Sequence, residues 1–311
     1  MSGPFELRFD ETPSAALSRI VSQQALATAG NLRDDAVALE RRVHETRKRF
    51  KELRAVLRLF RDALGEEQFA IENHWYRDAA RELAEYRDAD AIVAAIDALP
   101  PKVKKKIGRL NVQKLRRAGQ HEQRAVYADS TAAAGRLENI ATQLPVAAGR
   151  LTSISIGDDF TAVQSRLIAT LRIGKRAMKR AFETGDSVAF HEWRKRVKDH
   201  WYHVQLLVPV GQRKLVGREQ RLGKLSHVLG SHHDLDVIRR MMATAEATFT
   251  ANDARRIDRI LAARQRQLEK RARKIAAPLY KKSSEEMLRK AAKRWKKASR
   301  SAPELHLVAS A

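Results

Sequence analysis

The sequence contains no cysteine, few aromatic residues and no long apolar run. The lack of cysteine excludes disulfides, thiolate metal sites and a cysteine nucleophile, and it fits a reducing compartment. No apolar stretch approaches the ~18 residues that a membrane-spanning helix needs. Residues 1–13 include four charged side chains and lack the apolar centre of a signal peptide. We therefore expect a cytoplasmic protein that is not associated with a membrane.

Motifs of common catalytic sites are also missing. The chain has no Gly-x-x-x-x-Gly-Lys-Ser/Thr phosphate loop and no Gly-x-Ser-x-Gly nucleophile elbow. Its carboxylates are numerous, but no pair stands apart in an apolar context. These absences favour a binding protein over an enzyme, and we predict no cofactor and no metal.

Positive charge is what the sequence has in excess. Lysine and arginine number 61 against 37 acidic residues, a formal net charge of +24. Such a field attracts polyanions, so nucleic acid, anionic membranes and polyphosphate are the partners to weigh. Aromatic residues make up only 6% of the chain. This scarcity disfavours single-stranded nucleic acid, whose binding sites combine cations with stacking rings.

Helix-forming residues dominate the chain, while glycine and proline are sparse, so we predict an all-α fold. Asp88 and Asp234 are expected N-caps, because a carboxylate accepts hydrogen bonds from the first backbone N–H groups of a helix. Residues 145–158 lack helical periodicity and should connect two halves, and residues 299–311 should form a loose tail. The expected helices cover residues 13–29, 32–64, 66–86, 89–98, 102–144, 160–184, 187–208, 212–230, 235–249, 253–276 and 278–298.

A repeated block divides the chain into two halves. Residues 44–51 (HETRKRFK) and 191–198 (HEWRKRVK) share six identities in eight positions. Residues 83–90 (LAEYRDAD) similarly match 229–236 (LGSHHDLD), and the separation from the histidine to the first aspartate is 44 residues in one half and 43 in the other. A whole helical hairpin has therefore been duplicated. The pattern predicts two pseudo-twofold-related antiparallel bundles, residues 12–144 and 159–298, in one compact unit spanning 12–298.

The repeated helices each place their cations on one face. On a helix of 3.6 residues per turn, the first cationic face extends over about 25 Å from His44 to Arg61, with the apolar residues opposite. Like charges at this spacing repel, and a polyanion that accepts several charge-assisted hydrogen bonds would relieve the repulsion. Protonation of the two histidines would tighten binding at mildly acidic pH. The first strip is His44, Arg47, Lys48, Lys51, Arg54 and Arg58, and the second is His191, Arg194, Lys195, Lys198 and Tyr202.

Two strips that face each other would form a central basic cleft. Further cations on the preceding helices are candidates for its lining: Arg19, Arg166, Lys175, Arg176 and Lys179. Residues 102–117 hold eight cations and no acid, and residues 255–300 hold eighteen cations against four acids. No repeat supports these last two segments, and we interpret them as a nonspecific electrostatic surround.

Histidines near the second strip allow a competing interpretation. His227, His232, His233 and Asp234 are similar to the His…His-Asp…Asp arrangement that holds metal ions in some helical phosphohydrolases, with His191, His200 and His203 upstream. The matching positions of the first half are Tyr86 and Arg87 in place of His232 and His233. The repeat therefore favours caps or ion-pair acceptors over metal ligands.

The duplicated His-x-x-Arg-Lys-x-x-Lys helices and the Leu-x-x-x-Arg/His-Asp-x-Asp segments resemble the CHAD domain, the conserved histidine α-helical domain. The resemblance extends from about Thr12 to Lys297. It implies two bundles around a basic cleft that binds inorganic polyphosphate, in proteins that often associate with polyphosphate granules. Trp201 stands where the first half has Arg54, and Gln205 where it has Arg58, so the cleft should be asymmetric. Some relatives carry a catalytic domain marked by Glu-x-Glu-x-Lys, and that motif is absent here.

The sequence thus predicts a cytoplasmic polyphosphate-binding protein. A nonspecific nucleic-acid-binding protein is the main alternative, followed by a metal-dependent phosphohydrolase. The oligomeric state and the preferred chain length of the polyphosphate stay open.

Overall fold

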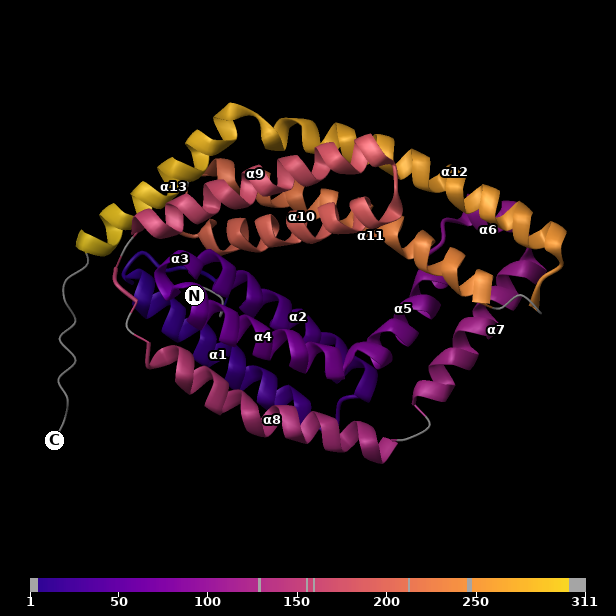
Figure 1. Cartoon of the computed structure of the whole chain (residues 1–311), viewed down its shortest axis with the longest axis horizontal. Helices are drawn as coiled ribbons and strands as arrows, with labels where there is room; N and C mark the ends of the chain where they lie inside the picture. Colours follow the sequence, from indigo (N-terminus) through magenta and orange to yellow (C-terminus); the bar gives the residue numbers. More distant parts are fainter. Residues whose placement is uncertain are drawn as a thin grey trace.

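Helices form almost all of the structure, a computed structural model that describes residues 5–127, 130–154, 156–158, 160–211, 213–244 and 248–301 (Figure 1). No strand occurs within these ranges, which confirms the all-α prediction. None of the helices described combines the length and the apolarity needed to cross a bilayer. The helices are α1 (Pro13–Arg33), α2 (Leu39–Leu59), α3 (Arg61–Leu64), α4 (Glu66–Glu82), α5 (Ala84–Asp97), α6 (Pro101–Ile107), α7 (Arg109–Val126), α8 (Ser130–Thr152), α9 (Phe160–Thr184), α10 (Ser187–Leu207), α11 (Arg213–Thr244), α12 (Ala251–Ala276), the 3₁₀ turn η2 (Ala277–Tyr280) and α13 (Lys282–Ser301).

Two layers of helices lie side by side and separate toward one end (Figure 1). One layer contains α1, α2, α4 and α8, and the other contains α9 to α13. At the far end α5 reaches across to α11, and α6 contacts α12. Contacts of α2 with α10, α10 with α11, α11 with α5 and α5 with α2 therefore form a closed circuit. The twofold relation between the halves stays a prediction.

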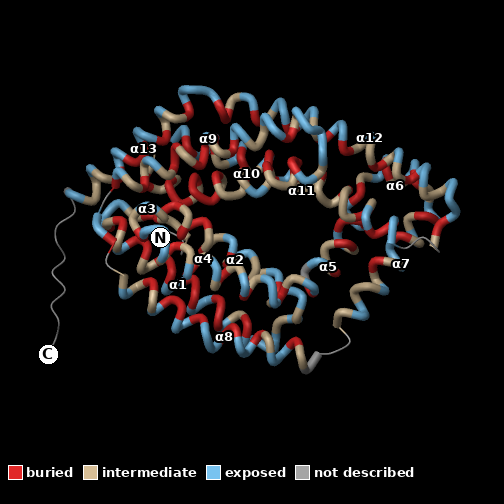
Figure 2. The backbone as a smooth tube through the Cα atoms, viewed as in Figure 1, coloured by how far each residue is buried: buried red, intermediate tan, exposed pale blue. Residues whose placement is uncertain are grey.

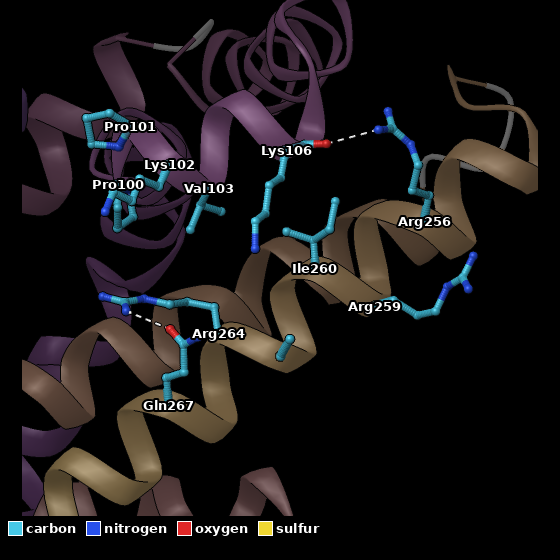
Figure 3. Close-up of a pocket in the computed structure, with 11 residues that line it drawn as sticks. Pro100, Pro101, Lys102, Val103, Lys106, Arg256, Arg259, Ile260, Arg264 and Gln267 are labelled. Atoms are coloured by element: carbon cyan, nitrogen blue, oxygen red, sulfur yellow. Dashed lines mark hydrogen bonds between the residues drawn. The ribbon is translucent and has the colours of Figure 1, made fainter.

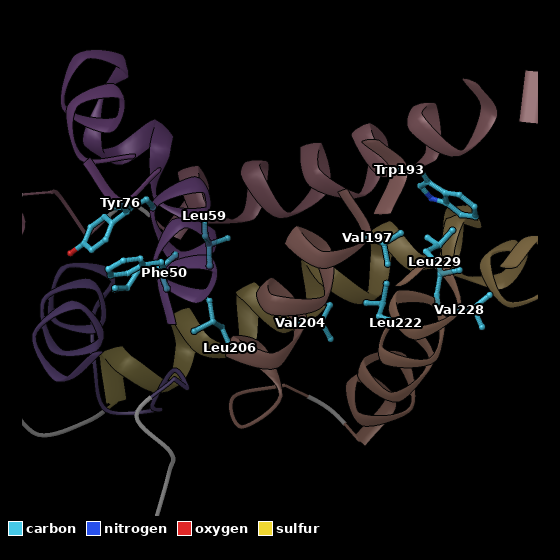
Figure 4. Close-up of a cluster of buried hydrophobic side chains, with 14 of the residues drawn as sticks. Phe50, Leu59, Tyr76, Trp193, Val197, Val204, Leu206, Leu222, Val228 and Leu229 are labelled. Carbon is cyan, nitrogen blue, oxygen red and sulfur yellow. The ribbon is translucent and has the colours of Figure 1, made fainter. Parts of the chain in front are cut away.

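The buried apolar side chains of both layers form one contiguous cluster. Figure 4 shows Phe50 and Tyr76 packed between α2 and α4, and Trp193 near Leu229 between α10 and α11. Buried residues follow the inner faces of the helices throughout, with exposed residues on the outside (Figure 2). Because one core serves both layers, α2 and α10 are held in a fixed relation to each other.

The N-terminal segment adds a second tie to the layer of α9 to α13. The Leu7 backbone N–H donates to the Leu206 carbonyl at 3.0 Å. The Trp295 indole N–H donates to the Arg8 carbonyl at 2.9 Å, and the Leu7 side chain is fully buried. Residues 5–12 thereby join the start of the chain to α10 and α13.

Local capping explains where several helices begin. Thr12 accepts from the Ala15 N–H, and Pro13 occupies the first helical position of α1. Asp186 accepts from the Ala189 N–H at 2.6 Å at the start of α10. That hydrogen bond is the main cause of the lowered pKa of Asp186. The cap fixes the end of α10 from which the second strip starts.

Glycine breaks the predicted helix at 102–144. Gly108 has φ of 92°, a conformation that costs glycine little and other residues much, and it separates α6 from α7. α7 ends at Val126 and α8 begins at Ser130, so the single long helix of the prediction is wrong. The predicted helix at 32–64 is likewise shorter, because α2 begins at Leu39 and ends at Leu59.

Helix continues through two positions where the sequence predicted an interruption. The expected connection at 145–158 is wrong over 145–152, where α8 passes through Pro145 and buries Ala147 and Leu151. That burial offsets the backbone hydrogen bond that proline removes. In the second half, α11 is one helix from Arg213 to Thr244 instead of two. Residue 299 also does not start the tail, since α13 runs to Ser301, and residues 302–311 lie outside the described part.

The predicted caps Asp88 and Asp234 are both inside helices, α5 and α11. In α11 the apolar spacing does not stop at Asp234, because Leu235, Ile238 and Met242 continue a buried face beyond it. Continued burial favours an unbroken helix over a capped break. In the first half the break comes earlier, at Leu83, and Asp90 accepts hydrogen bonds from Gln123 and Tyr127 of α7.

The two layers meet where α2 crosses α10. The buried His203 imidazole donates from Nε2 to the Ala55 carbonyl at 2.8 Å. Burial lowers the pKa of His203 to about 4, against 6.5 for an exposed histidine. The neutral form is therefore the one that the native crossing accommodates.

Stability should fall as pH drops from about 6.5 to about 4. The unfolded chain takes up a proton at His203 over this window while the native state does not, and the loss from this group is on the order of 3 kcal/mol. The measurement is chemical unfolding at pH 7 and pH 4.5 for the wild type and for His203→Gln, which keeps an N–H donor but does not titrate. The difference between the two pH values should be smaller in the variant. An equal difference in both proteins would contradict this assignment.

Candidate anion-binding surface

The first strip lies on the side of α2 opposite its core-facing residues. Val43, Phe50, Leu53 and Leu57 are fully buried. On the opposite side three cationic or titratable residues of the strip are exposed and three are half-buried. The exposed ones are His44, Lys48 and Lys51, and the half-buried ones are Arg47, Arg54 and Arg58.

The second strip repeats this arrangement on α10. Trp193 and Val197 are buried on the core side. Lys195 is exposed, and His191, Arg194 and Lys198 are half-buried. The structure does not bring Tyr202 into this group, because its ring is buried edge-on against Phe5 and is only 7% exposed.

The two strips lie on α2 and α10, which cross each other and then diverge. Near their C-terminal ends α2 and α10 are joined by the Arg58–Asp199 ion pair at 3.0 Å, next to the His203–Ala55 hydrogen bond. Toward their N-terminal ends the helices diverge, and α5 and α11 close the circuit (Figure 1). His44 and His191 therefore lie on the two diverging arms of one V-shaped pair.

Matching contacts hold both strips against their neighbours. Arg54 Nε donates to Asn73 Oδ1 of α4 at 3.1 Å. At the corresponding positions of the second half, Trp201 Nε1 donates to Glu219 Oε1 of α11 at 2.6 Å. Arg47 also donates to the Ala80 carbonyl near the end of α4. Trp201 thus makes a hydrogen bond to the neighbouring helix as Arg54 does, but it carries no charge, and the asymmetry of the cleft stays a prediction.

Positive charge accumulates around the first strip beyond what the strip itself supplies. Burial, and then the positive charges of Arg58, Arg77 and Arg81, lower the pKa of Arg54 to about 10. Arg77 and Arg81 belong to α4, and the sequence analysis did not select them. Their spacing of four residues on one helix was the available signal, but only the packing of α4 on α2 shows that this face meets the strip.

A histidine pair lies beside the second strip. The rings of His191 (α10) and His233 (α11) have centroids 4.3 Å apart, with their Nδ1 atoms 3.2 Å apart. Burial, then Lys195 and Arg194, lower the pKa of His191. Burial, then His191 and Arg194, lower the pKa of His233 to about 3. In the unliganded protein His233 is therefore neutral at mildly acidic pH, and His191 is protonated less readily than an exposed histidine.

Acidic residues do little to neutralise the exposed lysines. Lys48 lies 3.9 Å from Glu45, and Lys195 lies 3.3 Å from Glu192, one turn away on the same helix in each case. Such exposed pairs contribute well under about 1 kcal/mol and are screened by salt. Both lysines keep the freedom to bind a stronger anion.

The arginines near the crossing of α2 and α10 differ from the exposed lysines because they form ion pairs with carboxylates from other parts of the chain or from their own helix. Arg58, Arg61, Arg166 and Arg196 line a small pocket of about 110 Å³ with Asp199. Each has a carboxylate partner, and these are Asp199, Glu66, Asp62 and Glu192, respectively. This pocket therefore adds little net field, although it contains two predicted site residues, Arg58 and Arg166.

The remaining candidates lie apart from the strips. Arg19 is engaged by Glu11 at 2.6 Å and by the Glu6 carbonyl. Lys175, Arg176 and Lys179 are exposed on α9, where Lys179 pairs with Glu183 at 3.5 Å. The structure does not join these four residues to the strips of α2 and α10.

Apart from the His191–His233 pair, three buried histidines of the metal-site alternative have separate surroundings. His200 Nε2 accepts from the Arg218 guanidinium at 3.1 Å, an environment that repels a metal cation. His203 binds the Ala55 carbonyl, and His232 lies 3.1 Å from Glu269. Over the described residues, no three histidine, aspartate or glutamate side chains gather as a potential metal site.

Comparisons with known proteins agree with the resemblance to the CHAD domain. The model of the CHAD domain family matches residues 15–243. The crystal structure of the CHAD domain from the plant Ricinus communis superimposes with a TM-score of 0.61 at 17% identity, covering 88% of this chain and 94% of that chain. At this identity the likeness shows the fold alone. No curated protein gives a significant match to the sequence.

The lowered pKa values predict that His191 titrates below 6.5 and that His233 is neutral at pH 6 in the unliganded protein. Long-range ¹H–¹⁵N correlation spectra over a pH titration would show this, because ring nitrogen shifts report protonation directly. Assignment comes from His191→Gln and His233→Gln variants. Midpoints at or above 6.5 for either ring would contradict the proposed influence of burial and of the neighbouring cations.

Proposed function

The chain belongs to the CHAD domain family, and we propose that it binds inorganic polyphosphate through the two strips on α2 and α10. In this proposal the protein holds the polymer without performing chemistry on it. It acts in the cytoplasm, at polyphosphate granules. A linear chain of phosphates lies between the diverging arms and contacts cations of both.

The observation that carries the proposal is the pair of exposed lysines at matching positions, Lys48 and Lys195. They lie on two helices that share one crossing and one core. Residues three or four apart on a helix have Cβ atoms about 5–6 Å apart, so each strip offers closely spaced cations in a row. A flexible polyanion can follow such a row, whereas a single small anion would contact only part of it.

Charge repulsion supports the same ligand class. The formal net charge is +24, and burial, followed by the charges of three neighbouring arginines, lowers the pKa of Arg54. A polyanion would relieve this repulsion and accept charge-assisted hydrogen bonds at the same time. Bound phosphates near His191 and His233 would also raise the pKa of both rings, which would strengthen binding as pH falls.

The aromatic residues favour polyphosphate over single-stranded nucleic acid. Trp193 and Trp295 are fully buried, and Trp75 and Trp201 pack against the core cluster. Of the aromatic side chains in the described ranges, only Phe9 is classed as exposed, at 40%. Stacking of bases on open rings, the usual basis of single-strand binding, therefore has no platform along either strip.

Replacing one lysine of each strip with glutamate should greatly weaken the binding of polyphosphate. We expect Lys48→Glu combined with Lys195→Glu to weaken polyphosphate affinity at least a hundredfold near physiological salt, because the change removes two contacts and adds repulsion in both arms. Isothermal titration calorimetry with size-fractionated polyphosphate measures the effect. Circular dichroism should be unchanged, since both side chains are exposed.

The matched control replaces two lysines outside the strips with glutamate, so that the net charge changes by the same amount. Lys290→Glu with Lys293→Glu reverses two exposed lysines of α13, outside both strips. The control should retain most of the affinity. Equal losses in the two double variants would show that net charge alone governs binding and would contradict the assignment of the strips.

Competition separates polyphosphate from nucleic acid. With each polymer at equal total phosphate, polyphosphate should displace labelled duplex DNA and labelled single-stranded RNA from the protein. We expect polyphosphate to bind more tightly than either nucleic acid because the strips have no exposed aromatic rings on which bases could stack, and because polyphosphate is the more flexible chain. Displacement of labelled polyphosphate by DNA or RNA at lower phosphate concentration would favour the nucleic-acid alternative.

A further inference from the structure

A groove of about 820 Å³ lies between α6 and α12, away from the strips (Figure 3). It unites the two basic segments, 102–117 and 255–300, that the sequence could only treat as a diffuse surround. No acidic side chain is among its lining residues, which are Pro100, Pro101, Lys102, Val103, Lys106, Arg256, Arg259, Ile260, Ala263, Arg264 and Gln267.

The two walls of the groove are fixed to each other. Arg256 of α12 donates to the carbonyls of Lys106 at 2.9 Å and Ile107 at 2.7 Å, at the C-terminal end of α6 (Figure 3). A guanidinium at this end satisfies carbonyls that have no partner within the helix. Gly108 follows immediately, and a Cβ there would lie 3.8 Å from the Arg256 guanidinium. Asn111 of α7 adds a hydrogen bond to Asp253 of α12 at 3.0 Å.

The groove is amphipathic across its width. Pro101, Val103, Ile260 and Ala263 supply apolar surface between the helices (Figure 3). Cations stand on both sides of it. Lys102 and Lys106 belong to α6, and Arg259 and Arg264 belong to α12. Arg256 to Arg264 spans eight residues of α12, about 12 Å of rim.

We propose that this groove binds an acidic amphipathic helix of a partner protein, with an apolar stripe against the floor and glutamate or aspartate on both flanks. Charge complementarity selects this occupant, because five cations and no acid line the site. Polyphosphate would leave the apolar floor unused. A small anion would need cations that converge, whereas these stand on opposite rims. Helix-in-groove binding uses both features of the site at once.

The inference is independent of the proposed polyphosphate function, since no residue of either strip lines the groove. The probe is a fluorescent peptide of roughly 18 residues, long enough for measurable helicity in water. Its leucines recur at helical spacing, and its glutamates flank them on both sides. A second peptide has the same composition in scrambled order. Fluorescence anisotropy with the full chain near physiological salt measures both affinities.

The patterned peptide should bind at least tenfold more tightly than the scrambled one. Lys102→Glu with Arg259→Glu, two exposed side chains on opposite rims, should reduce its affinity at least tenfold. The Lys290→Glu, Lys293→Glu control should reduce it less than twofold. Polyphosphate affinity should stay within twofold of wild type in the groove variant.

Three results would overturn the proposal. Equal binding of the two peptides would mean that only net charge is recognised. Equal losses in the groove variant and the control would place the peptide elsewhere. A parallel loss of polyphosphate affinity in the groove variant would assign the groove to the polyphosphate surface instead of a partner helix.

Discussion

Repulsion among cations held close together is the interaction on which the functional account depends. Each strip keeps basic side chains at successive turns of a helix, and the crossing of α2 and α10 prevents the strips from moving apart. In water a flexible chain would separate these charges at little cost. The folded protein cannot do so, because the backbone positions are set by a core shared between both layers. A ligand with many negative charges is then the most effective way to lower the free energy of this surface.

The crossing and the strips thus have opposite electrostatic character. At the crossing, arginines are matched by carboxylates, as in the Arg58–Asp199 pair, and His203 is kept neutral by burial. Further along the arms, Lys48 and Lys195 are exposed and pair weakly with glutamates on their own helices. Ion pairing at the crossing of α2 and α10 stabilises the contact between the two helices. Lys48 and Lys195, further along, keep most of their positive charge. Under the proposed function, a bound anion would raise the pKa of the paired rings of His191 and His233.

Periodicity and the internal repeat gave the helical class and the orientation of the strips, because both depend on local spacing along one chain. Phe50 is buried and Lys48 is exposed, as a helical period requires. Tyr202 shows the limit of this reasoning. Its spacing places it near the strip, but contact with Phe5, a residue far away in the sequence, makes burial more favourable. Asp88 and Asp234 were assigned as caps from residue type, and the continued burial of apolar neighbours overrode that preference.

The sequence did not predict which distant segments of the chain pack against each other. Arg77 and Arg81 join the first strip only because α4 packs on α2. The groove of α6 and α12 lies between two segments about 150 residues apart in the chain, which Arg256 helps to hold together. The duplicated motif could identify positions that matter in both halves, but it had no information on surfaces that occur once.

The central claim is that several cations of the strips are neutralised together by one polyanion. Its most direct test is the salt dependence of polyphosphate affinity in the wild-type protein, measured as the slope of log Kd against log salt. The six lysines and arginines of the repeated motif predict a slope of about 4 by analogy with single-stranded nucleic acid; they are Arg47, Lys48, Lys51, Arg194, Lys195 and Lys198. A slope near zero would contradict the account, because binding would then not depend on the release of condensed counterions.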